Sequence, residues 1–351
     1  MLKPSTELEL IWAKKGDPAH SLLAHLLDTA AVAHALLRRE PPASIELYEA
    51  DWKLYEEQAL RWVAFLVGLH DLGKASPVFQ CRWPERAAQL WEVGLRWDKE
   101  RVGRDRNRVA HGVFTELFVR RLLVEDGLPP KVAAALGRAL GAHHGFTGEG
   151  RELKIASIHL GLEEGPWWEA RRQLVERLKE DLDVALPKVR EVSPAALLRV
   201  AALASFTDWI ASDPDFFPYG RSPTAPEFFQ KTLKMAERAL DRLNWHPLKL
   251  EPKPFAEIFP FPPNSLQAVV SHLLSEVKVP VLLLIEAPMG MGKTEAALYA
   301  SHILQSQVGH RGFYLALPTQ ATSNGLFPRV KLPRFGGRFT TWSAGMGVSL
   351  V

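Results

Sequence analysis

The stretch His70–Lys74 (HDLGK) offers the clearest chemistry in this sequence. It closes an apolar run, Trp62–Leu69, that predicts a buried helix. An imidazole and a carboxylate at the end of such a helix are costly to bury unless something satisfies them, and a bound cation does so. We therefore predict that His70 and Asp71 bind a metal. Lys74 follows Asp71 by three residues and His70 by four, so on a helix it would lie on the same side as both. There it would orient the aspartate or contact a phosphate; the alternative is a surface lysine beside the end of a helix.

Other candidate ligands lie far from this stretch, and each also has an ordinary structural explanation. They are His25, His111, His143, His144 and Asp208. On their own, His25 could be a core histidine bonded to a carbonyl and His111 a histidine at the start of a helix. A carboxylate at position 208, in a nearly all-apolar helix, needs a partner such as a metal or Arg199. The adjacent His143 and His144, flanked by glycines, favour metal binding over packing.

Together these residue types suit phosphodiester hydrolysis. That reaction needs a hydroxide at neutral pH and neutralised phosphoryl oxygens, and two cations roughly 3.5–4 Å apart supply both. Asp71 is the natural bridge between two metals. Neutral imidazoles favour iron, manganese, cobalt or nickel over magnesium. We thus expect a metal-dependent hydrolytic centre with two divalent transition-metal ions.

Two further segments carry weaker signals for nucleic acid. The arginines of 96–108 alternate with acidic residues, which usually indicates a solvated loop; the alternative is an edge that binds a phosphate backbone. Trp167 and Trp168 could stack bases, although packing beneath a helix start is the commoner role of such a pair.

The elements that must position these residues are predicted to be helices. Apolar residues recur every three or four positions from Ser21 to about Val200, and few stretches before Asn244 alternate as strands do. We read residues 1–245 as one all-helical domain. The expected helices are Ser21–Arg39, Glu57–Leu69, Val109–Val124, Lys131–Leu140, a charged surface helix Trp167–Leu182, and a central helix Pro194–Ile210.

The chain then changes character. Prolines exclude a continuous helix through 246–264, which we read as a linker. Residues 265–351 predict a partial α/β segment with a parallel sheet. Its expected elements are a buried strand Pro280–Ala287, a helix Lys293–Gln305, a strand Gly312–Leu317, and a helix Thr319–Phe327.

Between the first strand and its helix lies a phosphate-binding loop. Ala287–Thr294 (APMGMGKT) fits the Walker A pattern with alanine in the first glycine position. We expect the loop to bind Mg-ATP through Gly290, Gly292, Lys293 and Thr294, with Gln267 reading adenine. The turn at Thr319 could hold a nucleic-acid phosphate, although a simple strand-to-helix turn explains it as well.

The α/β segment lacks what ATP hydrolysis requires. After Gly312–Leu317 there is no apolar strand ending in Asp-Glu, and no second lobe follows to supply an arginine. We expect a truncated fragment that retains weak nucleotide binding without coupled hydrolysis.

Composition sets the remaining limits. A net charge of +3 permits a local basic groove but proves no nucleic-acid partner. The lone Cys81 excludes an internal disulfide and suits the cytoplasm. The N-terminus shows no signal-peptide core, and the apolar runs look too short to span a bilayer, so we expect no membrane.

The combination resembles the HD-domain nuclease–helicase of type I CRISPR interference. The resemblance rests on 68–74 (GLHDLGK) and the paired His143-His144, with the phosphate loop following, and covers nearly the whole chain. It implies an HD-domain helical bundle followed by part of a RecA-like lobe. It also implies one metal at His25, His70, Asp71 and Asp208, and another at Asp71, His111, His143 and His144. His70, Asp71 and Lys74 would be catalytic.

The resemblance further implies a function and its partners. The chain would be an endonuclease cleaving single-stranded DNA, with an ATP-dependent helicase in the full-length protein. It would act as a monomer recruited by an RNA-guided, multi-subunit surveillance complex. The metal ligands alone fit equally well an HD phosphohydrolase acting on nucleotides or cyclic nucleotides. A third possibility is a non-enzymatic, nucleotide-gated adaptor.

Overall fold

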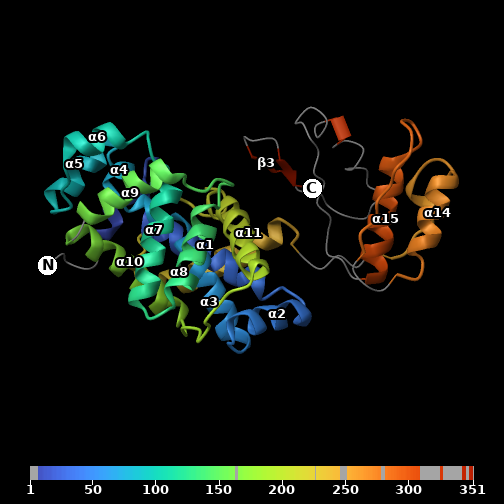
Figure 1. The fold of residues 1–351 in the computed structure, drawn as a ribbon, viewed down its shortest axis with the longest axis horizontal. Helices are drawn as coiled ribbons and strands as arrows, with labels where there is room; N and C mark the ends of the chain where they lie inside the picture. Colours follow the sequence, from blue (N-terminus) through green and yellow to red (C-terminus); the bar gives the residue numbers. More distant parts are fainter. Residues whose placement is uncertain are drawn as a thin grey trace. The chain divides into compact units, whose positions relative to one another are not determined.

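The computed structural model of the chain describes residues 7–162, 165–225, 227–245, 251–277, 281–308, 325–326, 342–344 and 348–350. Contacts between residues divide the chain into two units, Met1–Arg242 and Leu243–Val351. In Figure 1, the first unit runs from blue to yellow, and the helices of the second are orange.

The first unit is built almost wholly from helices. A short antiparallel pair, β1 (Trp12–Lys14) and β2 (His20–Ser21), follows the 3-10 helix η1 (Leu8–Leu10). The other elements are α1 (Leu22–Leu37), α2 (Pro42–Trp52), α3 (Glu56–Gly68), η2 (Leu69–Lys74), α4 (Pro77–Gln80), α5 (Pro84–Glu92), α6 (Lys99–Asp105), α7 (His111–Glu125), α8 (Pro130–Gly141), α9 (Gly150–Leu162), α10 (Pro166–Leu182), α11 (Pro194–Ala211) and α12 (Phe228–Arg242). The prediction of a helical bundle is therefore confirmed.

Helix α1 forms the centre of this unit. Ser21 caps it, because the Ser21 hydroxyl accepts a hydrogen bond from the Ala24 amide. Every residue of α1 is buried, and the helix packs against α3, α11 and α12. A helix that is apolar on all sides needs such a position. Its His25 is consequently placed deep inside the bundle.

Two sequence predictions within this unit were wrong in part. Segment 96–108 is not only a loop, because Lys99–Asp105 forms α6 with Asp98 as its N-cap. Helix α10 is not a purely surface helix, since Trp167, Trp168 and Arg171 are buried in it. Charged residues obscured the second pattern: the Arg171 guanidinium lies 3.8 Å from the Phe118 ring centre and so packs inside the bundle.

Helix α11 is central on one face only. It packs against α1, α3 and α8, whereas Leu198 on another face is 71% exposed. Among the described helices, α11 alone has the length and mean hydropathy of a membrane span, a test that core helices also pass. The expectation that the apolar runs were too short missed it, because polar residues such as Asp208 interrupt the run without ending the helix.

The second unit has a small core of its own. Helices α13 (Phe255–Ile258), α14 (Ser265–Leu274) and α15 (Lys293–Val308) contribute to it. Phe255 and Ile258, within the stretch predicted as a linker, are buried in this core beside Tyr299. The strands β3 (Trp342–Ala344) and β4 (Val348–Leu350) pair antiparallel.

The predicted strand before the phosphate loop is not formed in the structure. Residues 281–287 have no regular structure, and Leu282 and Leu284 are 97% and 86% exposed. A parallel strand needs a neighbour for its backbone hydrogen bonds. The neighbour predicted here, Gly312–Leu317, lies outside the described residues. So does the helix predicted at Thr319–Phe327, except for Gly325 and Leu326, which are helical.

Candidate metal centre

The predicted metal ligands, distant in sequence, meet at one place in the first unit. They come from α1, η2, the start of α7, the end of α8, and α11. Two groups form, each with ligand atoms within 4.8 Å of one another. One group is His25, His70, Asp71 and Asp208; the other is Asp71, His111, His143 and His144. Asp71 belongs to both groups.

The His-Asp pair lies on a 3-10 helix rather than on the α-helix predicted for it. Helix α3 ends at Gly68, and η2 carries the chain from Leu69 to Lys74. In a 3-10 helix, side chains three residues apart eclipse one another. Lys74 therefore lies over Asp71, with 2.5 Å between its Nζ and Asp71 Oδ2. Lys74 is buried, so the surface-lysine alternative is wrong.

Thr115 of α7 fixes the position of η2. Its hydroxyl donates to the His70 carbonyl at 2.9 Å and accepts from the Gly73 amide at 2.9 Å. Gly73 makes this approach possible, because a Cβ at that position would lie 1.9 Å from the His111 carbonyl oxygen. The glycine of the motif thus lets η2 lie directly against the start of α7, which brings Asp71 and His111 together.

Helices α7 and α8 approach closely through two glycines. A Cβ on Gly112 would lie 2.3 Å from the Gly141 carbonyl oxygen, and a Cβ on Gly141 would lie 2.5 Å from that of Gly112. Each glycine directly neighbours the centre: Gly112 follows His111, and Gly141 precedes the turn with His143. This backbone contact sets the spacing of the second ligand group.

The Asp71 carboxylate faces one ligand group with each oxygen. Oδ2 lies 3.1 Å from His25 Nε2 and 3.5 Å from His70 Nε2. Oδ1 lies 3.0 Å from His111 Nε2 and 3.4 Å from His143 Nε2. A carboxylate with this arrangement can bridge two cations.

Asp208 completes the first group from α11. Its Oδ1 lies 3.1 Å from His25 Nε2 and 3.5 Å from His70 Nε2. The hydroxyl of Ser212 donates to the same oxygen at 2.8 Å. Arg199, the alternative partner for Asp208, pairs instead with Asp51. The carboxylate in this apolar helix therefore belongs to the histidine cluster.

Backbone carbonyls orient two of the imidazoles. His70 Nδ1 donates to the Val67 carbonyl at 3.0 Å, and His143 Nδ1 donates to the Leu140 carbonyl at 2.7 Å. A carbonyl can only accept, so Nδ1 carries the proton in each ring. Both rings therefore present Nε2 to the centre, the arrangement found around protein-bound metals.

Unpaired polar atoms test whether a metal fits. Several buried ligand atoms make no hydrogen bond to any described residue, among them Nε2 of His70, His111 and His143, and Oδ1 of Asp71. Buried polar atoms are almost always hydrogen-bonded in native proteins, so such a cluster needs an explanation. Nitrogen lone pairs and carboxylate oxygens directed at one place fit divalent transition metals. The residues present therefore fit the predicted ligand.

Charge interactions inside the cluster shift the pKa values of its groups. Burial alone would lower the pKa of His70, but Asp71 and Asp208 raise it to about 9. Burial alone would raise the pKa of Asp71, yet Lys74, His70 and His111 hold it well below its usual range. Burial lowers the pKa of His25, and burial with His143 and His111 lowers that of His144 to about 4. A positive charge is thus stabilised beside the two carboxylates.

Metal binding should release about one proton at neutral pH, because a metal ligand must be deprotonated and the raised pKa keeps His70 protonated there. The apparent affinity for the metal should rise with pH until about pH 9, where that proton is already lost. Titration calorimetry with Mn²⁺ in buffers of different ionisation enthalpy measures the protons released. His144 is neutral at pH 7, so His144→Ala should leave the proton count unchanged. Binding at pH 7 without proton release would contradict this prediction.

Two residues at the centre were missed in the sequence. Lys14 of β1 lies 3.7 Å from Asp208 and is partly exposed, so it places a cation at the edge of the first group. His20 of β2 is buried, pairs with Asp28 at 3.1 Å, and has its ring 5.9 Å from that of His25. Neither has a motif or spacing that marks it, because a short antiparallel pair brings both to the centre. His144 is exposed and borders the second group.

The predicted nucleotide-binding residues also lie together, in the second unit. Lys293 Nζ donates to the carbonyls of Ala287 and Pro288, so it folds back onto the loop. Gln267 is buried, and both ends of its amide are occupied: Oε1 accepts from the Asn264 amide and Nε2 donates to the Gly292 carbonyl. Gln267 therefore supports the loop and caps α14. Reading adenine would require these hydrogen bonds to change.

Comparison with known proteins places the helical unit in a described family. The family model "Cas3, HD domain" matches residues 12–217. The chain is 55% identical over 334 residues to the CRISPR-associated endonuclease/helicase Cas3 of Thermus thermophilus, across 93% of this chain and 36% of that protein. The chain thus spans little more than a third of this curated relative.

Solved structures give the same result. The Thermus thermophilus cas3 HD domain, crystallised in the presence of Ni²⁺, is 51% identical with a TM-score of 0.56. The match covers 68% of this chain and 92% of that one. A chain of a CRISPR RNA-guided surveillance complex in a pre-nicking state is 26% identical with a TM-score of 0.62, across 94% of this chain and 38% of that one.

Proposed function

The chain belongs to the Cas3 HD-domain family and is a hydrolase, and from this premise we propose that it is a metal-dependent endonuclease that cleaves single-stranded DNA in type I CRISPR interference. The observation that supports this most strongly is the double ligand group that shares Asp71. A centre of this kind suits the hydrolysis of a phosphodiester bond.

We propose two ions, held by the two groups, with iron, manganese, cobalt or nickel as candidates. The nitrogen-rich ligand set supports a transition metal, and so does the Ni²⁺ present with the related HD domain. When bound, such ions supply a hydroxide at neutral pH and neutralise phosphoryl oxygens.

The protein's own side chains would orient the reaction. His70 and Asp71 hold the ligand geometry from η2, and Lys74 fixes the carboxylate at 2.5 Å. Lys14 is 26% exposed in its side chain and is therefore available to a substrate phosphate beside Asp208. The burial of His25, His70 and Asp71 excludes bulk water from the first group, which strengthens each electrostatic contact there.

The remaining parts of the proposal concern the longer protein. We propose residues 1–245 as the nuclease domain and 265–351 as part of a RecA-like helicase lobe, with 246–264 linking them and contributing Phe255 and Ile258 to the core of the second unit. Gly290, Gly292, Lys293 and Thr294, with support from Gln267, would bind Mg-ATP there. An RNA-guided surveillance complex is the proposed partner, as the match to a chain of such a complex suggests, and the monomer would act in the cytoplasm.

A direct test offers the protein two kinds of substrate with Mn²⁺. Circular single-stranded DNA should be nicked and then degraded, and chelation should stop the reaction until metal is added back. Free nucleotides and cyclic nucleotides should remain intact. If nucleotides release phosphate while the circle stays closed, the chain is a nucleotide phosphohydrolase instead.

Lys293→Ala should leave the rate of single-strand cleavage by this chain unchanged within about twofold. A substitution remote from a site and from packed or paired groups usually changes the free energy by no more than about 0.5 kcal/mol. Lys293 contacts only its own loop among the described residues, in a unit separate from the ligand groups. The measurement compares the initial cleavage rates of Lys293→Ala and the unchanged protein on the same circular single-stranded DNA, without nucleotide. A large loss would show that the phosphate loop contributes to the metal centre.

A further inference from the structure

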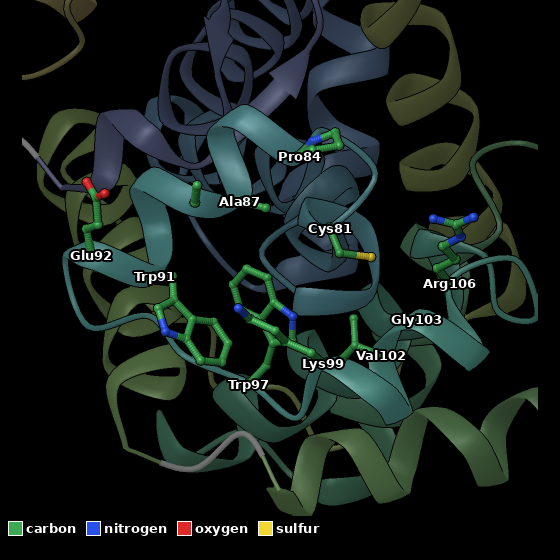
Figure 2. Close-up of a pocket in the computed structure, with 11 residues that line it drawn as sticks. Cys81, Pro84, Ala87, Trp91, Glu92, Trp97, Lys99, Val102, Gly103 and Arg106 are labelled. Atoms are coloured by element: carbon green, nitrogen blue, oxygen red, sulfur yellow. The ribbon is translucent and has the colours of Figure 1, made fainter.

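A pocket with no part in the proposed metal centre lies between α5 and α6. Its volume is about 450 Å³, within the range of roughly 300–1,000 Å³ typical of ligand sites. In Figure 2, Pro84, Ala87 and Trp91 of α5 line one side, and Lys99, Val102 and Gly103 of α6 line the other. A Cβ on Gly103 would have nothing within 4 Å, so the α6 side is open.

Aromatic rings and charged side chains make up the chemistry of this pocket: the cations Lys99 and Arg106, and the carboxylate of Glu92 at its edge. The rings of Trp91 and Trp97 meet edge to face with centres 5.2 Å apart, and both side chains are partly exposed. Lys99 Nζ lies 4.3 Å from the centre of the Trp91 ring. Arg106, at the other end of the pocket in Figure 2, is exposed and has no ion pair with any described residue. Indole rings beside exposed cations, with Lys99 already over the Trp91 ring, suit a base with its phosphate.

The aromatic wall is held in place before any ligand arrives. The Trp97 ring packs against Trp167 of α10, with ring centres 6.0 Å apart. Trp167 Nε1 in turn donates to the Arg96 carbonyl at 3.0 Å, and Asp98 caps α6. Ordered rings lose little conformational entropy when they bind a ligand, which favours affinity.

A short series of contacts links this pocket to the metal centre. The Phe79 ring centre lies 5.7 Å from that of His111, and the Arg82 guanidinium lies 5.4 Å from the same Phe79 ring. Arg82 Nη2 donates to the Arg106 carbonyl at 2.6 Å, and Arg82 Nε is buried with no hydrogen-bond partner among the described residues. Aromatic and basic side chains therefore continue from the second ligand group to the pocket edge.

We propose that the pocket between α5 and α6 binds a base of the single-stranded DNA that the metal centre cleaves, a few nucleotides from the scissile phosphate. The inference rests on the function proposed above. A DNA strand is favoured over a free nucleotide because the basic residues continue beyond the pocket towards the ligands. It is favoured over an acidic peptide because the pocket walls are flat indole rings, which stack on bases.

Affinity for DNA tests the proposal without cleavage. Binding of a fluorescent oligothymidine to the full chain is measured in EDTA. Trp91→Ala should raise Kd roughly tenfold, since stacking of one base on an aromatic ring has about that effect. Trp91→Phe should retain most of the affinity, because it keeps an aromatic ring.

The charge of Arg106 is tested in the same binding assay. Arg106→Glu should weaken binding and reduce its salt dependence. Arg190→Glu, an equal charge change at an exposed position outside the pocket, should do neither.

The single cysteine provides a second, independent readout. Cys81 lines the pocket and is partly exposed. Burial raises the pKa of its thiol, so alkylation is followed at alkaline pH. Oligothymidine should slow the modification of Cys81, and Trp91→Ala should remove this protection. Thymidine monophosphate at the same nucleotide concentration should protect far less.

The outcomes separate this inference from the proposed function. If the bound base lies a few nucleotides from the scissile phosphate, bis(p-nitrophenyl) phosphate does not span both sites, so its hydrolysis should be equal in Trp91→Ala and the unchanged protein. If DNA affinity and Cys81 protection are the same in all four variants, the pocket inference is wrong, while cleavage of DNA still stands. Stronger protection by the monophosphate than by the strand would also overturn it. If the unchanged protein hydrolyses the small ester but never DNA, the proposed function itself fails.

Discussion

Asp71→Ala should abolish DNA cleavage, with a loss of roughly a thousandfold or more in rate, because the proposed metals would contribute several kcal/mol to transition-state stabilisation. Each oxygen of this carboxylate faces a different ligand group, so one substitution removes a ligand from both. We expect most bound metal to be lost as well. Elemental analysis of the purified variant, beside cleavage of circular single-stranded DNA with Mn²⁺, measures both effects.

Removal of Asp71 also takes the carboxylate from the buried Lys74 and leaves His70 with Asp208 alone, so stability must be controlled. Asp51→Ala is the matched variant: it removes an ion-paired aspartate, the partner of Arg199, from α2, a helix that supplies no ligand. It should keep full metal content and cleavage. Asp71→Asn keeps the shape of the side chain and should still lose metal. Full metal stoichiometry with retained cleavage in Asp71→Ala would show that the carboxylate does not bridge.

The helices that carry the centre were predictable because their patterns are local. Apolar periodicity identified α1, α3, α7, α8, α10 and α11 to within a few residues. The candidate ligands could be chosen because a buried carboxylate or imidazole contradicts an apolar context. His70, Asp71 and Asp208 are such cases, and the structure brings them together with His25.

What the sequence did not reveal depends on contacts between distant segments. Lys14 and His20 reach the centre through a pair of strands only a few residues long, which has no periodicity to detect. The basic segment containing α6 was read as a loop because its arginines alternate with acidic residues. The helix buries only Val102 and Asp105, so it leaves almost no apolar pattern in the sequence. The predicted strand 280–287 shows the opposite error: an apolar run predicts a strand only if a neighbouring strand pairs with it.

The glycines at the α7–α8 contact lead to the second large effect. Gly112→Ala should place a Cβ 2.3 Å from the Gly141 carbonyl oxygen, so the two helices must move apart. Overpacking of this kind costs about 2–3 kcal/mol of unfolding free energy. Because His111 and His143 neighbour the contact, separation should also weaken metal binding roughly 10- to 100-fold, as loss of a ligand's supporting contact does. Denaturant unfolding and calorimetry with Mn²⁺ measure these two losses.

Gly161→Ala is the control, since it makes the same substitution near the end of α9, where a Cβ has nothing within 4 Å. It should be neutral or stabilise the protein by up to about 1 kcal/mol, because alanine is the better helix former. The comparison separates a geometric cause from a general effect of the substitution. If Gly112→Ala unfolds less readily than expected but still binds metal poorly, spacing rather than stability sets affinity. Unchanged metal binding would mean that His111 and His143 hold their places without the close helix contact.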